Sequence, residues 1–128
     1  MAAMIALVAA LIAALVHVWF FAMESVWFMR PTVWRRFGLT SAADAAIVRS
    51  FAFNQGFYNL FLAIGVLAGI ALVAARDPVA GGALILFACG SMIAAGVVLY
   101  LHNTRFLLAA ALQVLPPAIA VAGILLKG

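Results

Sequence analysis

Charged residues are scarce in this sequence, which has seven Lys and Arg and three Asp and Glu among 128 residues, or 8%. A water-soluble domain has about 25% charged residues, so a surface that faces water on all sides is excluded. The net charge of +4 rests on very few basic residues, several of which flank apolar runs. This placement is typical of contact with lipid headgroups. We therefore expect no nucleic acid among the partners.

Cysteine is limited to Cys89, which lies within an apolar run. A single cysteine excludes an intrachain disulfide and a CxxC motif. The sequence also lacks a glycine-rich phosphate loop, an HExxH metal motif and a G-x-S-x-G nucleophile motif. It therefore predicts neither a metal site nor a cofactor.

Apolar residues, by contrast, make up 70% of the chain, and the mean hydropathy is +1.32. A soluble fold of this length has too little interior to bury so much apolar surface. The first apolar run has no basic segment before it and continues to Phe28, which is longer than the apolar part of a signal peptide. We expect an integral membrane protein whose first segment is a retained transmembrane helix.

Four segments have the length of ~20 mostly apolar residues that a spanning helix needs. Arg30-Pro31 ends the first, since a residue before proline avoids the helical conformation. Ser41 and Asp44 form a candidate capping box before the second. These features predict an all-α fold, a four-transmembrane-helix bundle with short loops and a single membrane domain over residues 1–128. The expected helices cover residues 2–28, 45–75, 79–101 and 106–126.

Basic residues are distributed unevenly between the two ends of these helices. Five lie at the first and third loops and two at the opposite end; they are Arg30, Arg35, Arg36, Arg49 and Arg105 against Arg76 and Lys127. The positive-inside rule therefore places the first and third loops in the cytoplasm and both termini on the non-cytoplasmic side.

Two ionisable residues interrupt the first span. His17 and Glu24 are seven residues apart, which places both on one face of an α-helix. An ionisable group at bilayer depth costs at least ~2.5 kcal/mol and needs a partner or a purpose. Two interpretations of Glu24 stay open: a carboxylate that reaches the membrane interface, and a buried carboxyl with a partner. His17 is either a hydrogen-bonded structural residue or a reactive one.

A cluster of amides and a phenol interrupts the second span. Asn54 and Tyr58 form one i,i+4 pair, and Gln55 and Asn59 form another. Gln113 adds an amide in the fourth span, where two prolines predict a kink. All these residues and Glu24 lie in the cytoplasmic half of the expected spans. The cluster is either a set of interhelical hydrogen bonds or the lining of a polar ligand pocket.

The chain resembles the small bacterial four-helix membrane proteins that form a family of unknown function with the hallmark N-Q-G-x-Y-N-x-F-L-A. Here the hallmark reads Asn54-Gln55-Gly56-Phe57-Tyr58-Asn59-Leu60-Phe61-Leu62-Ala63. The family's His, Glu and Trp pattern is similar to His17, Glu24 and Trp27; its later elements are similar to Ala95-Gly96, Thr104 and Gln113 to Pro116. Leu60 and Pro117 depart from the family pattern. The resemblance implies the fold, a bacterial plasma (inner) membrane location and this choice of residues, but no activity.

Three functions remain open at this point. The preferred one is binding of, or action on, a lipophilic small molecule or membrane lipid. Glu24 and His17 are its candidate catalytic residues, as acid/base or cation partner and as relay, while Asn54, Gln55, Tyr58, Asn59 and Gln113 supply orienting hydrogen bonds. The alternatives are a proton-coupled exporter acting as a homodimer and a helper subunit of a membrane complex. The sequence leaves open whether the protein is an enzyme.

Overall fold

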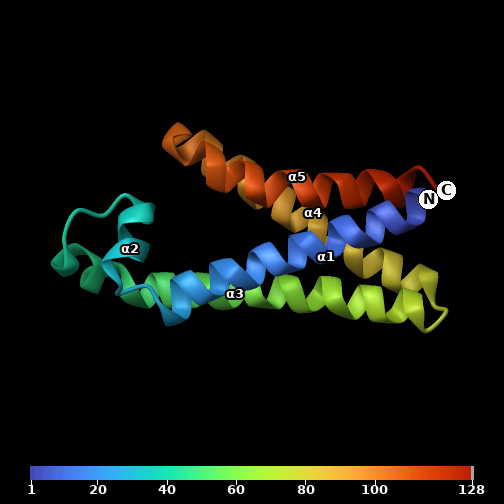
Figure 1. The fold of residues 1–128 in the computed structure, drawn as a ribbon, viewed down its shortest axis with the longest axis horizontal. Coiled ribbons are helices and arrows are strands. Elements are labelled where there is room, and N and C mark those ends of the chain that lie inside the picture. Colours follow the sequence, from blue (N-terminus) through green and yellow to red (C-terminus); the bar gives the residue numbers. More distant parts are fainter. Residues whose placement is uncertain (128) are drawn as a thin grey trace. The chain divides into compact units, whose positions relative to one another are not determined.

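The computed structural model describes residues 1–127, and those residues form helices and turns with no strand. Figure 1 shows the course of the chain. The elements are α1 (Ala2–Phe21), η1 (Ala22–Val26), α2 (Pro31–Trp34), η2 (Arg35–Phe37), α3 (Ala42–Ala74), α4 (Pro78–His102), η3 (Thr104–Phe106) and α5 (Leu107–Leu125). The predicted all-α class is confirmed.

Four helical segments are long and apolar enough to cross a membrane, as the sequence predicted. They cover Ala2–Val26, Ala42–Ala74, Pro78–His102 and Thr104–Leu125, and each limit lies within three residues of the expected one. The first span ends two residues early, because its backbone changes to a π-helix at Ala22 and then to turns. Pro116 and Pro117 lie inside α5.

Side-chain caps begin two of the long helices. The hydroxyl of Ser41 accepts a hydrogen bond from the backbone N–H of Asp44 at 3.1 Å, which satisfies a free donor at the start of α3. Arg76 adopts a left-handed conformation with φ 69° after α3. Asp77 then caps α4 by accepting from the N–H of Ala80 at 3.1 Å.

The chain divides into two compact units, which are described separately. The first contains residues 1–16 and residues 62 onward. In it, α3 and α4 approach closely at two glycines, because a Cβ on Gly81 would lie 2.5 Å from the carbonyl oxygen of Gly69. A Cβ on Gly123 would lie 2.7 Å from the Cβ of Ala6, so the start of α1 packs on the end of α5. Both termini therefore lie at the same end of this unit.

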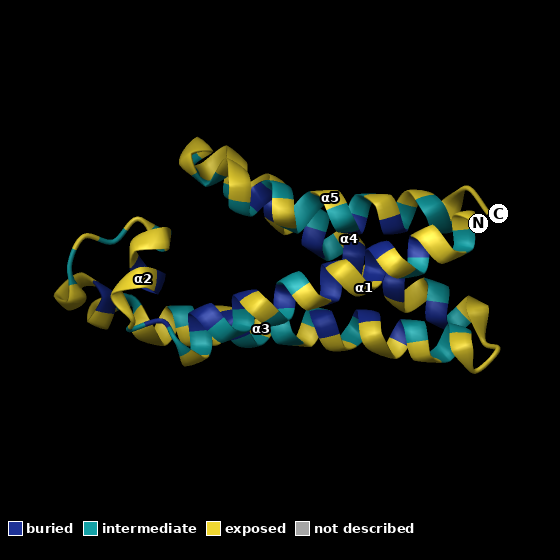
Figure 2. Cartoon of the chain, in the orientation of Figure 1, coloured by how far each residue is buried: buried dark blue, intermediate teal, exposed yellow. Residues whose placement is uncertain are grey.

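On α1 small side chains are buried and large apolar ones are exposed, which is the reverse of the usual pattern in a soluble protein. Five of its alanines are buried, among them Ala6, Ala10 and Ala13, whereas Ile5 and Leu15 are more than half exposed. Figure 2 shows this alternation of buried and exposed residues along the helix. Small residues let helices pack closely in lipid, and large apolar residues contact the acyl chains. The pattern is that of a membrane-spanning helix.

The second unit contains residues 17–61. It comprises the end of α1, η1, the short helices α2 and η2, and the first part of α3. Phe28, Trp34 and Ala45 form its core, with Phe37 and Val48 packed around them. Pro31 begins α2 at the position where a helix tolerates proline best. The sequence predicted a loop in this region, and its two short helices were not expected.

Candidate functional site

A π-helical turn ends the first membrane span at the predicted acidic residue. The N–H of Trp27 donates to the carbonyl of Ala22 at 2.8 Å, a bond across five residues, and Glu24 lies in the middle of this turn. π-turns occur at the C-termini of helices. The expected common face of His17 and Glu24 assumed an unbroken α-helix, and the π-turn changes the rotation between them.

Glu24 is a buried carboxyl with an amide partner. Only 8% of Glu24 and 7% of Asn59 is exposed. The Nδ2 of Asn59 donates a hydrogen bond to Glu24 Oε2 at 3.1 Å. A buried carboxyl needs such a partner, because an unpaired polar group in an apolar environment costs several kcal/mol. Of the two interpretations of Glu24, the structure has the buried, paired one.

Gly56 allows η1 to lie directly against α3. Gly56 is buried, and a Cβ there would overlap the hydroxyl of Ser25 and lie 3.1 Å from the Cβ of Glu24. The Ser25 hydroxyl also donates to the backbone carbonyl of Phe53 at 2.8 Å. This close approach brings the Glu24 carboxyl within reach of Asn59, one turn further along α3.

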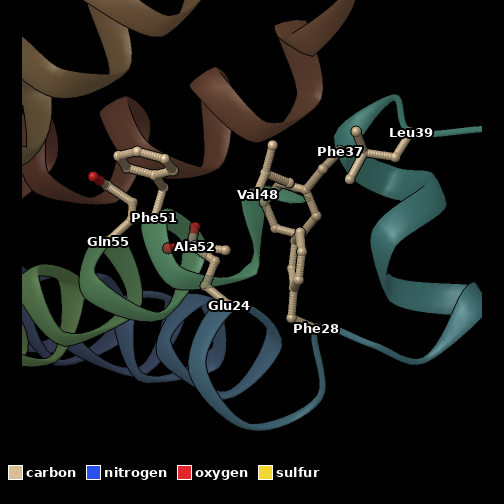
Figure 3. A pocket seen from close by; sticks show the side chains of 8 residues that line it. All are labelled: Glu24, Phe28, Phe37, Leu39, Val48, Phe51, Ala52 and Gln55. Carbon is tan, nitrogen blue, oxygen red and sulfur yellow. The ribbon is translucent and has the colours of Figure 1, made fainter. Parts of the chain in front are cut away.

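Glu24 lines an open groove with a volume of about 410 Å³. Figure 3 shows the lining side chains, which come from η1, from the segment that follows it and from α3. Two of them, Glu24 and Gln55, are polar, and the others are apolar or aromatic: Phe28, Phe37, Leu39, Val48, Phe51 and Ala52. A concave, mostly apolar site with a few polar groups is typical of small-molecule sites.

One oxygen of the Glu24 carboxyl is still available. Within residues 17–61 the carboxyl makes one hydrogen bond, from Asn59 to Oε2, and no ion pair with an arginine of that unit. Among the described residues, the fully buried polar side-chain atom without a hydrogen-bond partner is Trp34 Nε1. Glu24 Oε1 is not such an atom. Oε1 therefore retains surface exposure and lacks a donor, so it can accept a hydrogen bond from a molecule in the groove.

The other predicted residues of the second span lie on different sides of α3. Gln55 lines the groove with Glu24. Asn54 and Tyr58 are exposed and stand outside the groove lining. Each is two residues from Gly56, or about 200° around the helix, so they project from the side opposite η1. The structure thus brings Glu24, Asn59 and Gln55 together and separates Asn54 and Tyr58 from them.

His17 and Gln113 lie outside the groove lining. His17 is 1% exposed, and its ring meets that of Phe20 edge to face at a centroid distance of 5.5 Å. Gln113 lies on α5 in the other unit, half-buried, where a Cβ on Gly96 would be 3.0 Å from its Cβ. Their proposed roles as relay and orienting residue stay predictions.

Sequence reasoning missed the aromatic part of the groove. Phe28, Phe37 and Phe51 line it, but they belong to a connecting segment and to an exposed helix face, where apolar periodicity carries no information. Gly56 was expected to allow close approach by another helix, and the structure confirms that approach. Its position opposite two consecutive residues, Glu24 and Ser25, depends on the π-turn, for which the sequence has no signal that we can identify.

The four spans place the chain in the class of small helical integral membrane proteins. Its site, a carboxyl–amide pair beside an apolar groove, lies wholly within residues 17–61. A family model described as "Protein of unknown function (DUF1304)" matches residues 11–125, and the chain belongs to this family. No curated protein and no solved structure matches the chain. The match confirms the expected membership in a family of unknown function and supplies no activity.

Proposed function

We propose that this membrane protein binds an amphiphilic small molecule or lipid in the groove at Glu24. The apolar body of the ligand lies among the aromatic side chains, and its head donates a hydrogen bond to Glu24 Oε1. The observation that carries the proposal is the buried Glu24 carboxyl, which has one oxygen held by Asn59 and the other without a donor beside an apolar groove.

The lining defines the body of the ligand. A volume of about 410 Å³ falls within the roughly 300–1,000 Å³ of small-molecule sites. Phenylalanine rings provide large apolar contact areas, and Phe28, Phe37 and Phe51 supply three of them here. A polar or highly charged metabolite would leave its own groups unpaired against this lining, which favours a lipophilic ligand.

The carboxyl defines the head. A carboxyl oxygen that carries no proton accepts hydrogen bonds, so a hydroxyl or an ammonium group is complementary to Oε1. Gln55 adds an amide with both donors and an acceptor at the groove. The ligand class is therefore an amphiphile with a hydroxyl or amine head.

The surroundings of the groove fit the depth at which amphiphile heads lie in a bilayer. The guanidinium of Arg30 lies 5.3 Å from the centre of the Trp27 ring, and that of Arg35 lies 5.3 Å from the Trp34 ring. Tryptophan and arginine together are typical of the membrane–water interface. A ligand can then enter the groove from the lipid while its head group stays at the membrane–water interface.

The open groove also favours binding over a purely structural role. A helper subunit whose polar residues only hold helices together needs no groove and no unpaired acceptor. Glu24 lines a groove, and one oxygen of its carboxyl has no donor. The alternative function is a proton-coupled exporter that acts as a dimer, which would need a polar path at its two-fold interface.

Photolabelling tests the proposal with hexadecyl probes that carry a diazirine in the chain and a hydroxyl, amine or carboxylate head. In bilayers containing the full chain, the hydroxyl and amine probes are expected to label residues of the groove such as Phe28 and Phe51. Glu24→Leu should abolish this preference, while Val79→Leu, an exposed apolar position in the other unit, should leave it intact. Labelling that is uniform along the lipid-facing residues and independent of the head would refute the proposal.

A further inference from the structure

The two polar side chains of the groove lie at the same end of it. From α3, residues 48–55 line the groove with a stripe at spacings of three and four residues, and Gln55 is the last of them. Glu24 packs against the next residue, Gly56, because a Cβ there would lie 3.1 Å from the Cβ of Glu24. In Figure 3, Glu24 and Gln55 both lie to the left of Phe37, which lines the apolar end.

This polar end offers two hydrogen-bond acceptors. Gln55 is exposed, and its amide forms no hydrogen bond with a residue of 17–61. Its carbonyl oxygen, Oε1, is an acceptor, and its NH₂ group carries two donors. Glu24 Oε1 is the other acceptor without a donor in this unit. A bound head therefore covers two oxygens that need hydrogen-bond donors.

One ligand head can reach both acceptors. Consecutive Cα atoms lie ~3.8 Å apart, so the backbone of Gln55 is one residue away from the point where Glu24 meets α3. A hydroxyl group has a single donor, and Glu24 Oε1 uses it. The Gln55 oxygen then loses its water to the ligand and gains nothing in return, which weakens binding.

We propose that Gln55 selects amphiphiles whose head carries at least two hydrogen-bond donors, as a 1,2-diol or a primary ammonium group does. The inference rests on the proposed function, the binding of an amphiphile in the groove at Glu24. One donor pairs with Glu24 Oε1 and the other with Gln55 Oε1. Gln55 is thus a specificity-determining residue, and an alcohol with one hydroxyl is a weaker ligand than a diol of the same chain length.

Competition for the hydroxyl photoprobe, in bilayers containing the full chain, tests the need for a second donor. The competitors are hexadecane-1,2-diol and 2-methoxyhexadecan-1-ol, which share the first hydroxyl and differ at the second, where a methyl group replaces the donor hydrogen. In the wild type the diol is expected to compete about 2- to 12-fold better, which corresponds to one hydrogen bond. Equal competition by the two compounds would overturn the proposal, and this comparison depends on no variant.

Two variants test whether Gln55 receives the second donor. Gln55→Met keeps a long side chain at an exposed position and removes the amide, so the diol and its methyl ether should compete equally. Ser50→Ala removes an exposed hydroxyl of α3 outside the groove lining and should keep the preference for the diol. A preference that persists in Gln55→Met would come from the bulk of the methyl group or from another acceptor, and it would overturn the role of Gln55.

Hexadecanol and hexadecyl methyl ether separate this inference from the proposed function. If these two compete equally in the wild type, the head is not recognised at Glu24 and both proposals fail. If hexadecanol competes better than its ether while the diol and 2-methoxyhexadecan-1-ol compete equally, the proposed function stands and the requirement for two donors is refuted.

Discussion

Replacing Gly56 by alanine tests how the site is held together. An added Cβ would overlap the Ser25 hydroxyl and lie 3.1 Å from the Cβ atoms of both Glu24 and Ser25. Overpacking of this kind costs about 1–3 kcal/mol. To relieve it, η1 must move away from α3, which lengthens the bond between Glu24 and Asn59. We expect Gly56→Ala to lower the free energy of unfolding by about 1–3 kcal/mol.

The double variant with Ser25→Ala makes this prediction specific. Ser25→Ala alone removes the hydrogen bond to the Phe53 carbonyl and should cost about 1 kcal/mol. It also removes the atom that a Cβ on Gly56 would meet first. The two changes therefore share one cause, and the double variant should be no less stable than Gly56→Ala. The expected coupling energy is about 1 kcal/mol or more.

The assay is unfolding in mixed micelles followed by tryptophan fluorescence. All three tryptophans, Trp19, Trp27 and Trp34, lie in residues 17–61, so the signal reports on the unit that contains the site. Independent sites add within about 0.3–0.5 kcal/mol. Strict additivity of the two changes would refute the argument that Gly56 sets the distance between η1 and α3.

Three further changes probe other contacts. Asn59→Leu leaves the buried Glu24 carboxyl without its donor and should cost about 1–3 kcal/mol in the same fluorescence assay; an unchanged midpoint would mean that the bond contributes nothing. Gly81→Ala would place a Cβ 2.5 Å from the Gly69 carbonyl oxygen and should lower the melting temperature, measured by circular dichroism, through a loss of about 1–3 kcal/mol; a melting temperature equal to the wild type's would contradict that close approach. Asp77→Ala removes the cap of α4 and should cost about 1 kcal/mol by the same melting experiment, and a gain in stability would show that the cap is not formed.

The sequence predicted the fold class and the four spans because the requirement for ~20 apolar residues per span leaves few alternatives. The capping residue Ser41 was also predicted, since a cap uses local chemistry. What the sequence did not show is the fold of the connecting segment. Its short helices follow from contacts of Trp34 and Phe28 with α3 residues such as Ala45, and periodicity along the chain does not encode such contacts.

For the candidate site, the sequence identified the chemistry better than the geometry. Glu24 and Asn59 were both chosen from their cost in a membrane, and the structure pairs them at 3.1 Å. The structure divides the amides and the phenol of the second span between two sides of α3, with Gln55 and Asn59 on the side of Glu24 and Asn54 and Tyr58 exposed outside the groove lining. That distinction depends on which face meets Ser25, and the π-turn at Ala22–Val26 decides it.

The central claim is that Glu24 Oε1 accepts a hydrogen bond from an amphiphile in the groove. Its most direct test is competition for the hydroxyl photoprobe by hexadecanol and by hexadecyl methyl ether, which differ in the hydroxyl donor. The account predicts that hexadecanol competes about 2- to 12-fold better than the ether in the wild type, which corresponds to the free energy of one hydrogen bond. In Glu24→Leu the alcohol and the ether should compete equally well. Equal competition by the alcohol and the ether in the wild type would contradict the claim.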